Sequence, residues 1–186
     1  YKIKLEFKIN MKNCSYMFAK CNNIIDINLN RFNSKYIENM KFMFYKCSNL
    51  KKINLPNFNT KLVKNMSNMF SFCNSLEILD LSSFDTKNVI DMSNMFNNCT
   101  NLKRIDLYNF NTKSVIDMNN MFSFCENLNH LNLSSFDTTN VNDMKYLFYK
   151  CKKIENINLF NFNTEKVTDM NHMFSYCNKL KNLDLN

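Results

Sequence analysis

The sequence predicts an α/β repeat fold: a solenoid of about seven coils of 26 residues, with a parallel β-sheet on one face and short helical turns. The first observation is a set of seven cysteines, each 26 residues from the next: Cys21, Cys47, Cys73, Cys99, Cys125, Cys151 and Cys177. The second is that nine apolar positions recur in each repeat. The third is that glycine is absent and proline occurs once, so asparagine must supply the turns.

Residues 73–98 illustrate the strand expected in each repeat. Leu76, Leu79 and Leu81 follow Cys73, and the alternation of Leu79 and Leu81 places both side chains on one face of a short strand. One repeat alone buries too little apolar surface to fold, so the units must stack. Stacking places neighbouring strands about 4.8 Å apart in a parallel sheet.

The second half of each repeat predicts the helical turns. Met92, Met95, Phe96 and Cys99 have spacings of three and four residues, which favour one or two turns of helix. This spacing also leaves open a longer helix that begins at Val89. The preceding acidic row is expected to cap backbone amides, with a calcium-binding ladder as the alternative; it comprises Asp91, Asp117, Asp143 and Asp169. A threonine row is expected to satisfy turn backbone: Thr60, Thr86, Thr112, Thr138 and Thr164.

The domain organisation is expected to be a short cap followed by one solenoid. Residues 1–10 contain the alternating apolar side chains Ile3, Leu5, Phe7 and Ile9, which predict a capping strand. Residues 11–186 then form a single solenoid of 26-residue repeats. The sequence stops partway through a repeat, so we expect the C-terminal end to be truncated and the chain to be a piece of a longer protein.

The repeat resembles a known family. Residues 76–99, LEILDLSSFDTKNVIDMSNMFNNC, with their copies at 102–125 and 154–177, resemble the BspA-like leucine-rich-repeat family of bacterial surface proteins. The resemblance covers about residues 11–186 and implies a leucine-rich-repeat-like solenoid, with a second short strand or bridge at 89–92. It also implies adhesion to host proteins or other cells. The family often has glycine before the cysteine, where this chain has Phe72, Asn98, Phe124 or Lys150.

The cysteines are expected to be structural. No CxxC pair occurs, and one thiol per coil cannot supply a tetrahedral zinc site. Stacked coils could bring cysteines within disulfide range, but seven thiols in register cannot all pair. We therefore expect a structural cysteine ladder of buried free thiols. Cys14 lies outside this ladder and is the best candidate for a reactive or paired thiol.

No pattern in the sequence predicts catalysis. The two histidines, His130 and His172, do not recur in other coils and neighbour no nucleophile at a recognised spacing. No Ser-His-Asp order, glycine-rich phosphate loop or metal motif is present. We therefore expect a protein that is not an enzyme and needs no cofactor or metal.

The composition limits the classes of partner. A hydrophobic content of 45% argues against a disordered chain, and no apolar run approaches the ~18 residues of a membrane span. The net charge of +8 can indicate a nucleic-acid, glycan or anionic-surface partner, but a solvated lysine surface explains it as well. Because no basic run occurs, we expect no specific nucleic-acid binding.

The candidate binding face consists of residues that flank the inward leucines on the strands. Extended solenoid faces bind proteins, and arginine and aromatic side chains are favoured at binding hot spots. The predicted face comprises Lys52, Ile78, Asp80, Arg104, Asp106, Tyr108, His130 and Phe160.

The predicted function is a non-catalytic protein-interaction or adhesion module of a cell-surface protein, present as a monomeric array. The ligand would be a protein or glycan, for example of a host surface or matrix. By the family resemblance the location is the cell surface or outside the cell. One alternative is an intracellular, cytoplasmic leucine-rich-repeat scaffold, which free thiols would permit because oxidising compartments favour paired cysteines. The other is a structural stalk of a surface protein.

Overall fold

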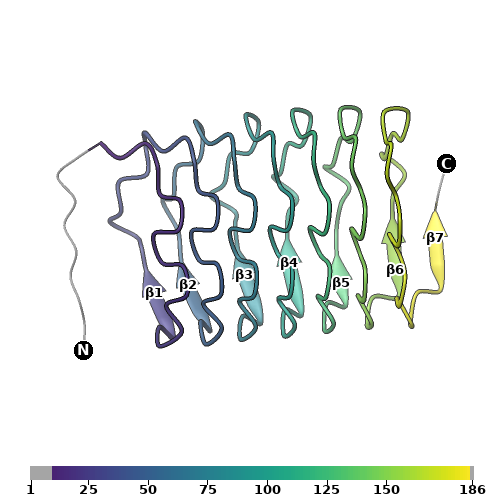
Figure 1. The fold of residues 1–186 in the computed structure, drawn as a ribbon, viewed down its shortest axis with the longest axis horizontal. Coiled ribbons are helices and arrows are strands. Elements are labelled where there is room, and N and C mark those ends of the chain that lie inside the picture. Colours follow the sequence, from purple (N-terminus) through teal and green to yellow (C-terminus); the bar gives the residue numbers. More distant parts are fainter. Residues whose placement is uncertain (1–9, 185–186) are drawn as a thin grey trace.

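The computed structural model describes residues 10–184, which form one array of stacked coils. Figure 1 shows the strands side by side, in chain order, along the long axis of the array. Each described strand lies 26 residues after the one before it: β1 Asp26–Asn28, β2 Lys52–Asn54, β3 Ile78–Asp80, β4 Arg104–Asp106, β5 His130–Leu131, β6 Asn156–Asn158 and β7 Asn182–Asp184. The predicted repeat of parallel strands is therefore confirmed.

The strands pair in parallel, and their hydrogen bonds divide them into three short sheets. These sheets are β1-β2, β3-β4-β5 and β6-β7. The register is one full repeat, so Leu79 lies beside Ile105, and Ile105 beside Leu131. The second residue of each strand packs in or against the core, and Leu79 and Ile105 are only 2% and 1% exposed.

A second line of backbone pairing runs along the array. Isolated parallel bridges join equivalent residues of successive coils, for example Asn65 to Asp91 and Asp91 to Asp117. This pairing is the bridge that the family resemblance implied at residues 89–92. Each coil is therefore held to its neighbours at two places, once at its strand and once at the bridge.

The core is continuous from coil to coil because the same apolar side chains stack on one another. Phe70, Phe96 and Phe122 lie nearly parallel, with ring centroids 6.0 and 5.6 Å apart. A second set of stacked rings includes Phe58 and Phe84, at 5.9 Å. Stacked aromatic pairs of this kind contribute about 0.5–1.5 kcal/mol beyond the area they bury.

The predicted helical turns are wrong: the described residues contain no helix. In residues 92–99 the amide of Met95 donates to the carbonyl oxygen of Met92 (3.2 Å), which closes a turn. The next amide, that of Phe96, instead donates to Met121 of the following coil (2.9 Å). Alternate amides thus bond within the coil and between coils, whereas every interior amide of an α-helix bonds four residues back along its own chain.

Left-handed backbone is the physical reason for these turns. Asn94 and Asn98 have φ of 57° and 58°, as the third residue of a type II turn requires. The described coils each contain two such residues, fourteen in all, with φ between 55° and 63° and no glycine among them. Only four of the fourteen are asparagine, so the expectation that asparagine supplies the turns is wrong for most of them: six are phenylalanine or tyrosine, three are lysine and one is histidine. The second position in each coil, just before the cysteine, is the one where the resembled family often has glycine.

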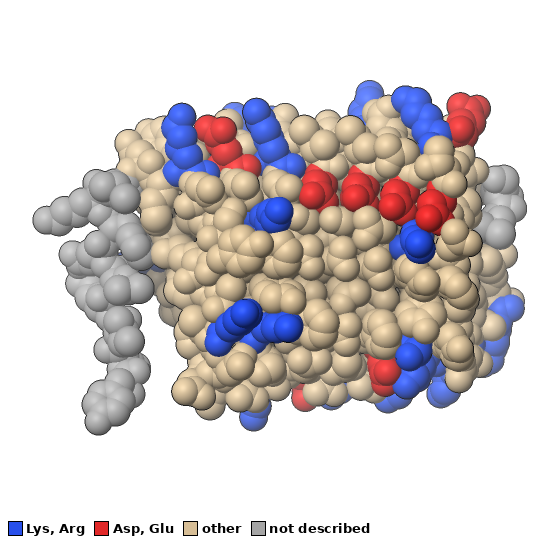
Figure 2. Space-filling model, viewed as in Figure 1, with Lys and Arg blue, Asp and Glu red and all other residues tan. Residues whose placement is uncertain are grey.

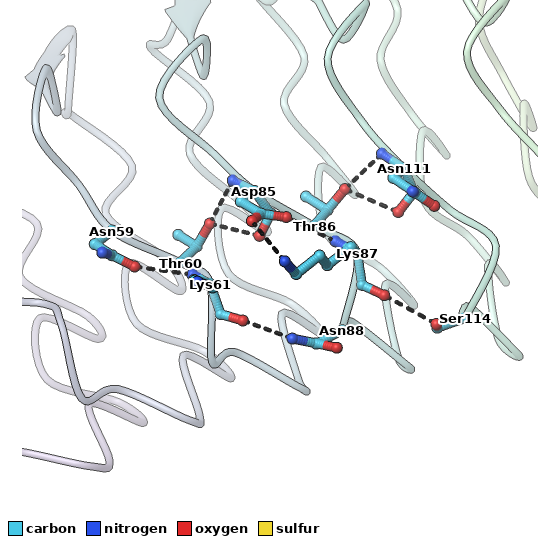
Figure 3. Close-up of polar contacts among 9 residues, drawn as sticks. All are labelled: Asn59, Thr60, Lys61, Asp85, Thr86, Lys87, Asn88, Asn111 and Ser114. Atoms are coloured by element: carbon cyan, nitrogen blue, oxygen red, sulfur yellow. Dashed lines mark hydrogen bonds and ion pairs between the residues drawn. The ribbon is translucent and has the colours of Figure 1, made fainter.

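A threonine row closes the coils on another edge, as expected from the sequence. The hydroxyl of Thr60 donates to the carbonyl oxygen of Asp85 (2.8 Å) and accepts the amide of Asp85 (2.8 Å). Figure 3 shows the same arrangement one coil further on, between Thr86 and Asn111. Thr60 and Thr86 are buried, so these bonds satisfy backbone groups beside the core.

The predicted capping strand at 1–10 lies almost entirely outside the described residues, which begin at Asn10.

Candidate functional site

The predicted binding face lies on the solvent side of the strands. Ile78, Arg104 and His130 stand next to one another in the register of β3, β4 and β5, and all three side chains are exposed. Ile78 is 69% exposed. Lys52 is exposed in the same row, but it belongs to the separate β1-β2 sheet.

The two acidic residues of the predicted face, Asp80 and Asp106, hold the turns that follow their strands. The Asp80 carboxylate accepts the amide of Ser82 (2.9 Å), and that of Asp106 accepts the amide of Tyr108 (3.2 Å), as in Asx turns. Hydrogen bonds from the backbone amide and hydroxyl of Ser82 hold the pKa of Asp80 below its ordinary value. These carboxylates end the strands and orient the residues that follow.

The aromatic residues of the face project beyond those turns. Tyr108 is 60% exposed and Phe160 is 64% exposed. The Phe160 amide donates to the Asn158 side chain (2.9 Å), so the same turn orients both aromatic residues. Phe160 follows β6 in another sheet and lies two coils, about 10 Å, from Tyr108. The structure therefore places Ile78, Arg104, Tyr108 and His130 on one three-stranded sheet, with Lys52 one coil before Ile78 and Phe160 two coils after Tyr108.

The cysteine ladder lies inside the array. Cys73, Cys99, Cys125 and Cys151 have no exposed surface. Each thiol donates to a phenylalanine carbonyl oxygen of the preceding coil, as Cys99 does to Phe70 (3.1 Å). Burial raises the pKa of Cys99 to about 12. These groups are held as neutral thiols and pack as small apolar side chains.

Cys14 is not the paired or reactive thiol that the sequence suggested. It is free and only 2% exposed, at a position equivalent to the core methionine Met40 of the next coil. Burial raises the pKa of its thiol to about 11, which keeps it protonated at neutral pH.

The row Asp91, Asp117, Asp143 and Asp169 follows the bridges, and Figure 2 shows acidic side chains in a line along the array. The Asp117 carboxylate accepts the backbone amide (2.8 Å) and the side-chain amide (2.6 Å) of Asn119. Burial raises the pKa of Asp117, and the nearby Asp91 and Asp143 raise it further, against the opposing effect of the bonds from Asn119. The row thus caps turn amides, as expected, although the turns are not helical.

The histidines occupy different settings. His130 is an exposed member of the strand face. His172 stacks on Tyr146, with centroids 5.0 Å apart, and its Nδ1 lies 3.1 Å from the Ser175 hydroxyl.

Among residues 10–184, no three His, Cys, Asp or Glu side chains converge as ligands for a metal ion. The described part of the chain also holds no helix that could span a bilayer.

A second exposed surface, which the sequence reasoning missed, lies on the turns. It consists of aromatic rings with lysine ammonium groups over them, around residues 41–47 and 145–151. The signal for it is present in the sequence, as KFMFYKC at 41–47 and KYLFYKC at 145–151. These segments lie 104 residues apart, so a comparison of successive coils does not detect them.

These features define a class of protein: a repeat solenoid in which each coil buries the same kind of apolar residue at the same position, while the exposed residues differ from coil to coil. More particularly, the chain belongs to the DUF285 family, described as a Mycoplasma protein of unknown function, whose profile matches residues 12–105 and again 73–186. A leucine-rich repeat protein from Bacteroides ovatus has a similar crystal structure, with 22% identity and a TM-score of 0.47. That match covers 78% of this chain and 40% of the other. None of the curated proteins matches the sequence.

Proposed function

We propose that this chain is a non-catalytic protein-interaction module, and that it binds through the strand face formed by Ile78, Arg104, Tyr108 and His130. The observation that carries the proposal is the exposure of Ile78 (69%) and Tyr108 (60%) around an arginine on one three-stranded sheet. Arginine and tyrosine dominate binding hot spots because they combine large contact area with directed hydrogen bonds. A flat sheet surface of this kind suits a protein partner better than a small molecule, which needs a concave pocket.

The rigid scaffold supports this proposal. The side chains behind the face, such as Leu79 and Ile105, are buried, and the turns that carry the exposed residues are fixed by Asp80 and Asp106. Binding would therefore order few side chains beyond those in contact, which lowers the entropic cost of association.

We place the module on a cell-surface protein, where it acts in adhesion to host proteins, host glycans or other cells. The support is the resemblance of residues 76–99 and their copies to the BspA-like leucine-rich repeats of bacterial surface proteins. The competing proposals are an intracellular scaffold, which would use the same face, and a structural stalk, which would use none.

The location is tested on intact cells of the source organism. Protease added outside should remove an antibody epitope in residues 10–184 without lysis. A cytoplasmic protein of the same cells, probed on the same blot, controls for leakage. Protection of the epitope until lysis would reject the surface module and leave the intracellular scaffold.

The binding face is tested with the double variant Arg104→Ala/Tyr108→Ala. Immobilised host matrix proteins and intact host cells would be probed with labelled chain 1–186. The double variant should lose about tenfold or more in affinity, the typical effect at a hot spot. The control is Ser82→Ala/Ser134→Ala, which changes exposed residues equivalent in position to Tyr108. Equal binding by both variants would remove this face as the site, and a lack of binding by the wild type would favour the stalk.

A further inference from the structure

The turn surface of the array carries the same cluster of side chains twice. The first cluster contains Lys41, Phe42, Tyr45 and Lys46 of one coil with Phe72 of the next. The second contains Lys145, Tyr146, Tyr149 and Lys150 with Tyr176. Every member of the second cluster lies 104 residues, or four coils, after its counterpart. The coils between them carry asparagine or serine at the positions of Phe42 and Tyr45, for example Asn94 and Asn97.

The two clusters agree closely in the geometry of their rings. Phe42 and Tyr45 meet edge to face at 5.0 Å and 89°, and Tyr146 and Tyr149 do so at 5.1 Å and 85°. The contact to the following coil is also edge to face in both clusters. The ring centroids are 5.8 Å apart for Tyr45–Phe72 and 5.5 Å apart for Tyr149–Tyr176.

The lysines occupy equivalent places over those rings. The Nζ atom of Lys46 lies 5.2 Å from the centre of Tyr45 and 5.3 Å from that of Phe72. The Nζ atom of Lys150 lies 5.3 Å from Tyr149 and 5.6 Å from Tyr176. In the second cluster Phe124 adds a third ring, 4.6 Å from Lys150. Each cluster therefore presents a cation at a fixed position among ring surfaces.

The cations at the centre of each cluster, Lys46 and Lys150, have no acidic partner among residues 10–184. Within the described residues, Lys41, Lys46 and Lys150 make no salt bridge, whereas Lys145 lies 3.8 Å from Asp169. The rings are also open to solvent in part, with Tyr176 61% exposed. A carboxylate that approaches Lys46 or Lys150 would gain a charge-assisted hydrogen bond, and an aromatic or apolar group beside it would cover the rings.

The surroundings select the type of anion. Asn94, Asn98 and Asn120 supply neutral amides between the clusters, and the acidic row Asp91 to Asp169 runs three residues before the ring positions. A continuous polyanion, such as single-stranded nucleic acid, would lie along this acidic row and be repelled by it. A protein segment carries isolated carboxylates and can place them only where the lysines are.

We infer that the two clusters are related docking sites for acidic segments of a partner protein that also carry aromatic side chains. The segment's carboxylates pair with Lys46 in one site and Lys150 in the other, and its aromatic side chains pack on the neighbouring rings. The two sites lie about 19 Å apart, four coils at about 4.8 Å each. The inference does not depend on the strand face, which lies elsewhere on the coil.

The test is calorimetric titration of chain 1–186 with a ten-residue peptide of alternating glutamate and tyrosine. Two binding sites per chain are expected. The double variants Tyr45→Ala/Lys46→Ala and Tyr149→Ala/Lys150→Ala should each leave one site, and their combination should leave none. Lys153→Ala, which removes an exposed lysine beside the second cluster, should keep both sites, as should Arg104→Ala/Tyr108→Ala of the strand face.

Two further ligands test whether the sites require aromatic side chains and whether they prefer an acidic peptide to a nucleic acid. A glutamate–alanine peptide of the same length should bind about tenfold more weakly, because it cannot cover the rings. Ten-residue oligothymidylate should bind more weakly than the glutamate–tyrosine peptide. The inference is overturned if that peptide does not bind, if the glutamate–alanine peptide binds equally well, or if oligothymidylate binds more tightly. Lys46→Gln and Lys150→Gln, which remove the charge but keep a long polar side chain, replace any alanine variant whose thermal unfolding shows loss of the fold.

Discussion

The hydroxyl group of Thr86 satisfies both backbone polar groups of Asn111 in the next coil. It donates to the carbonyl oxygen at 3.0 Å and accepts the amide at 2.8 Å. Thr60, Thr112 and Thr138 make the same pair of bonds, each to the residue 25 positions further on. One buried side chain per coil therefore ties successive coils together at this edge.

Replacement of Thr86 by valine should lower the free energy of unfolding by about 1–3 kcal/mol. Valine keeps the shape but leaves the amide and carbonyl of Asn111 without these partners. Urea denaturation followed by circular dichroism measures the loss. Thr164→Val is the matched control, because Thr164 is exposed and its hydroxyl makes no hydrogen bond within residues 10–184. Equal losses in the two variants would contradict a coil-to-coil role for the hydroxyl.

Asn98→Gly should be more stable than Asn98→Ala by about 1 kcal/mol, because a left-handed backbone strains alanine but not glycine. Asn98 has φ of 58°, and both variants remove its side-chain bond to Asn97, so their difference reports the backbone alone. Thermal unfolding at one pH measures it. At Asn129, which is not left-handed, glycine should be the less stable of the two. Alanine ranking above glycine at both positions would argue against the left-handed turn.

Asp117→Asn should raise the free energy of unfolding at pH 7 by roughly 1 kcal/mol, because it removes a charge that is partly buried and that also lies between Asp91 and Asp143. Asn39 and Asn65 show that asparagine fits this position, and the Asn65 side chain accepts the same turn amide (2.9 Å). The pKa of Asp117 is raised in the folded state, so its ionisation opposes folding. The advantage of asparagine should therefore shrink as the pH falls through the folded-state pKa and Asp117 becomes neutral.

Asp137→Asn provides the opposite control for that experiment. Bonds from the hydroxyl and amide of Thr139 lower the pKa of Asp137, so its ionised form stabilises the fold and this contribution is lost at low pH. Asparagine should therefore lower stability here at pH 7. A gain of stability at both positions would show that removal of any acidic charge has the same effect.

Cys73, Cys99, Cys125 and Cys151 should react with a thiol reagent roughly a hundredfold more slowly in the folded chain than in urea at pH 8. Burial removes access and raises the pKa of Cys99 to about 12, so little thiolate forms. Mass spectrometry of labelled peptides gives the rate at each cysteine. Cys21 is only partly buried and is the internal reference for an accessible thiol. Reaction of Cys99 as fast as Cys21 would contradict the buried ladder.

The repeat and the inward strand residues were predictable from the sequence because the same apolar residue returns every 26 positions. The turns were not. Met92, Met95, Phe96 and Cys99 have a spacing that suits a helix, and successive turns with Asn94 and Asn98 left-handed bury the same residues. The deciding property is backbone handedness, which apolar spacing does not report.

The candidate surfaces were predictable only in part. Alternation around Leu79 identifies Ile78 and Asp80 as outward-facing, but it cannot show that Asp80 is engaged by Ser82. The ring and lysine clusters recur after four coils instead of one, and their contacts join residues of neighbouring coils. A comparison that looks for residues common to all coils does not detect these clusters, because the coils differ from one another at the ring and lysine positions.

The bonding between coils also determines how the array responds to force. Strand pairs, bridges, thiols and threonines all join residues of successive coils, 25 to 29 positions apart. Hydrogen bonds between neighbouring strands point along the array axis, so tension along that axis opens one interface at a time. Each coil that detaches releases 26 residues, or roughly 90 Å of extended chain. A tether made of such coils would lengthen in steps under load and limit the peak force on whatever it holds.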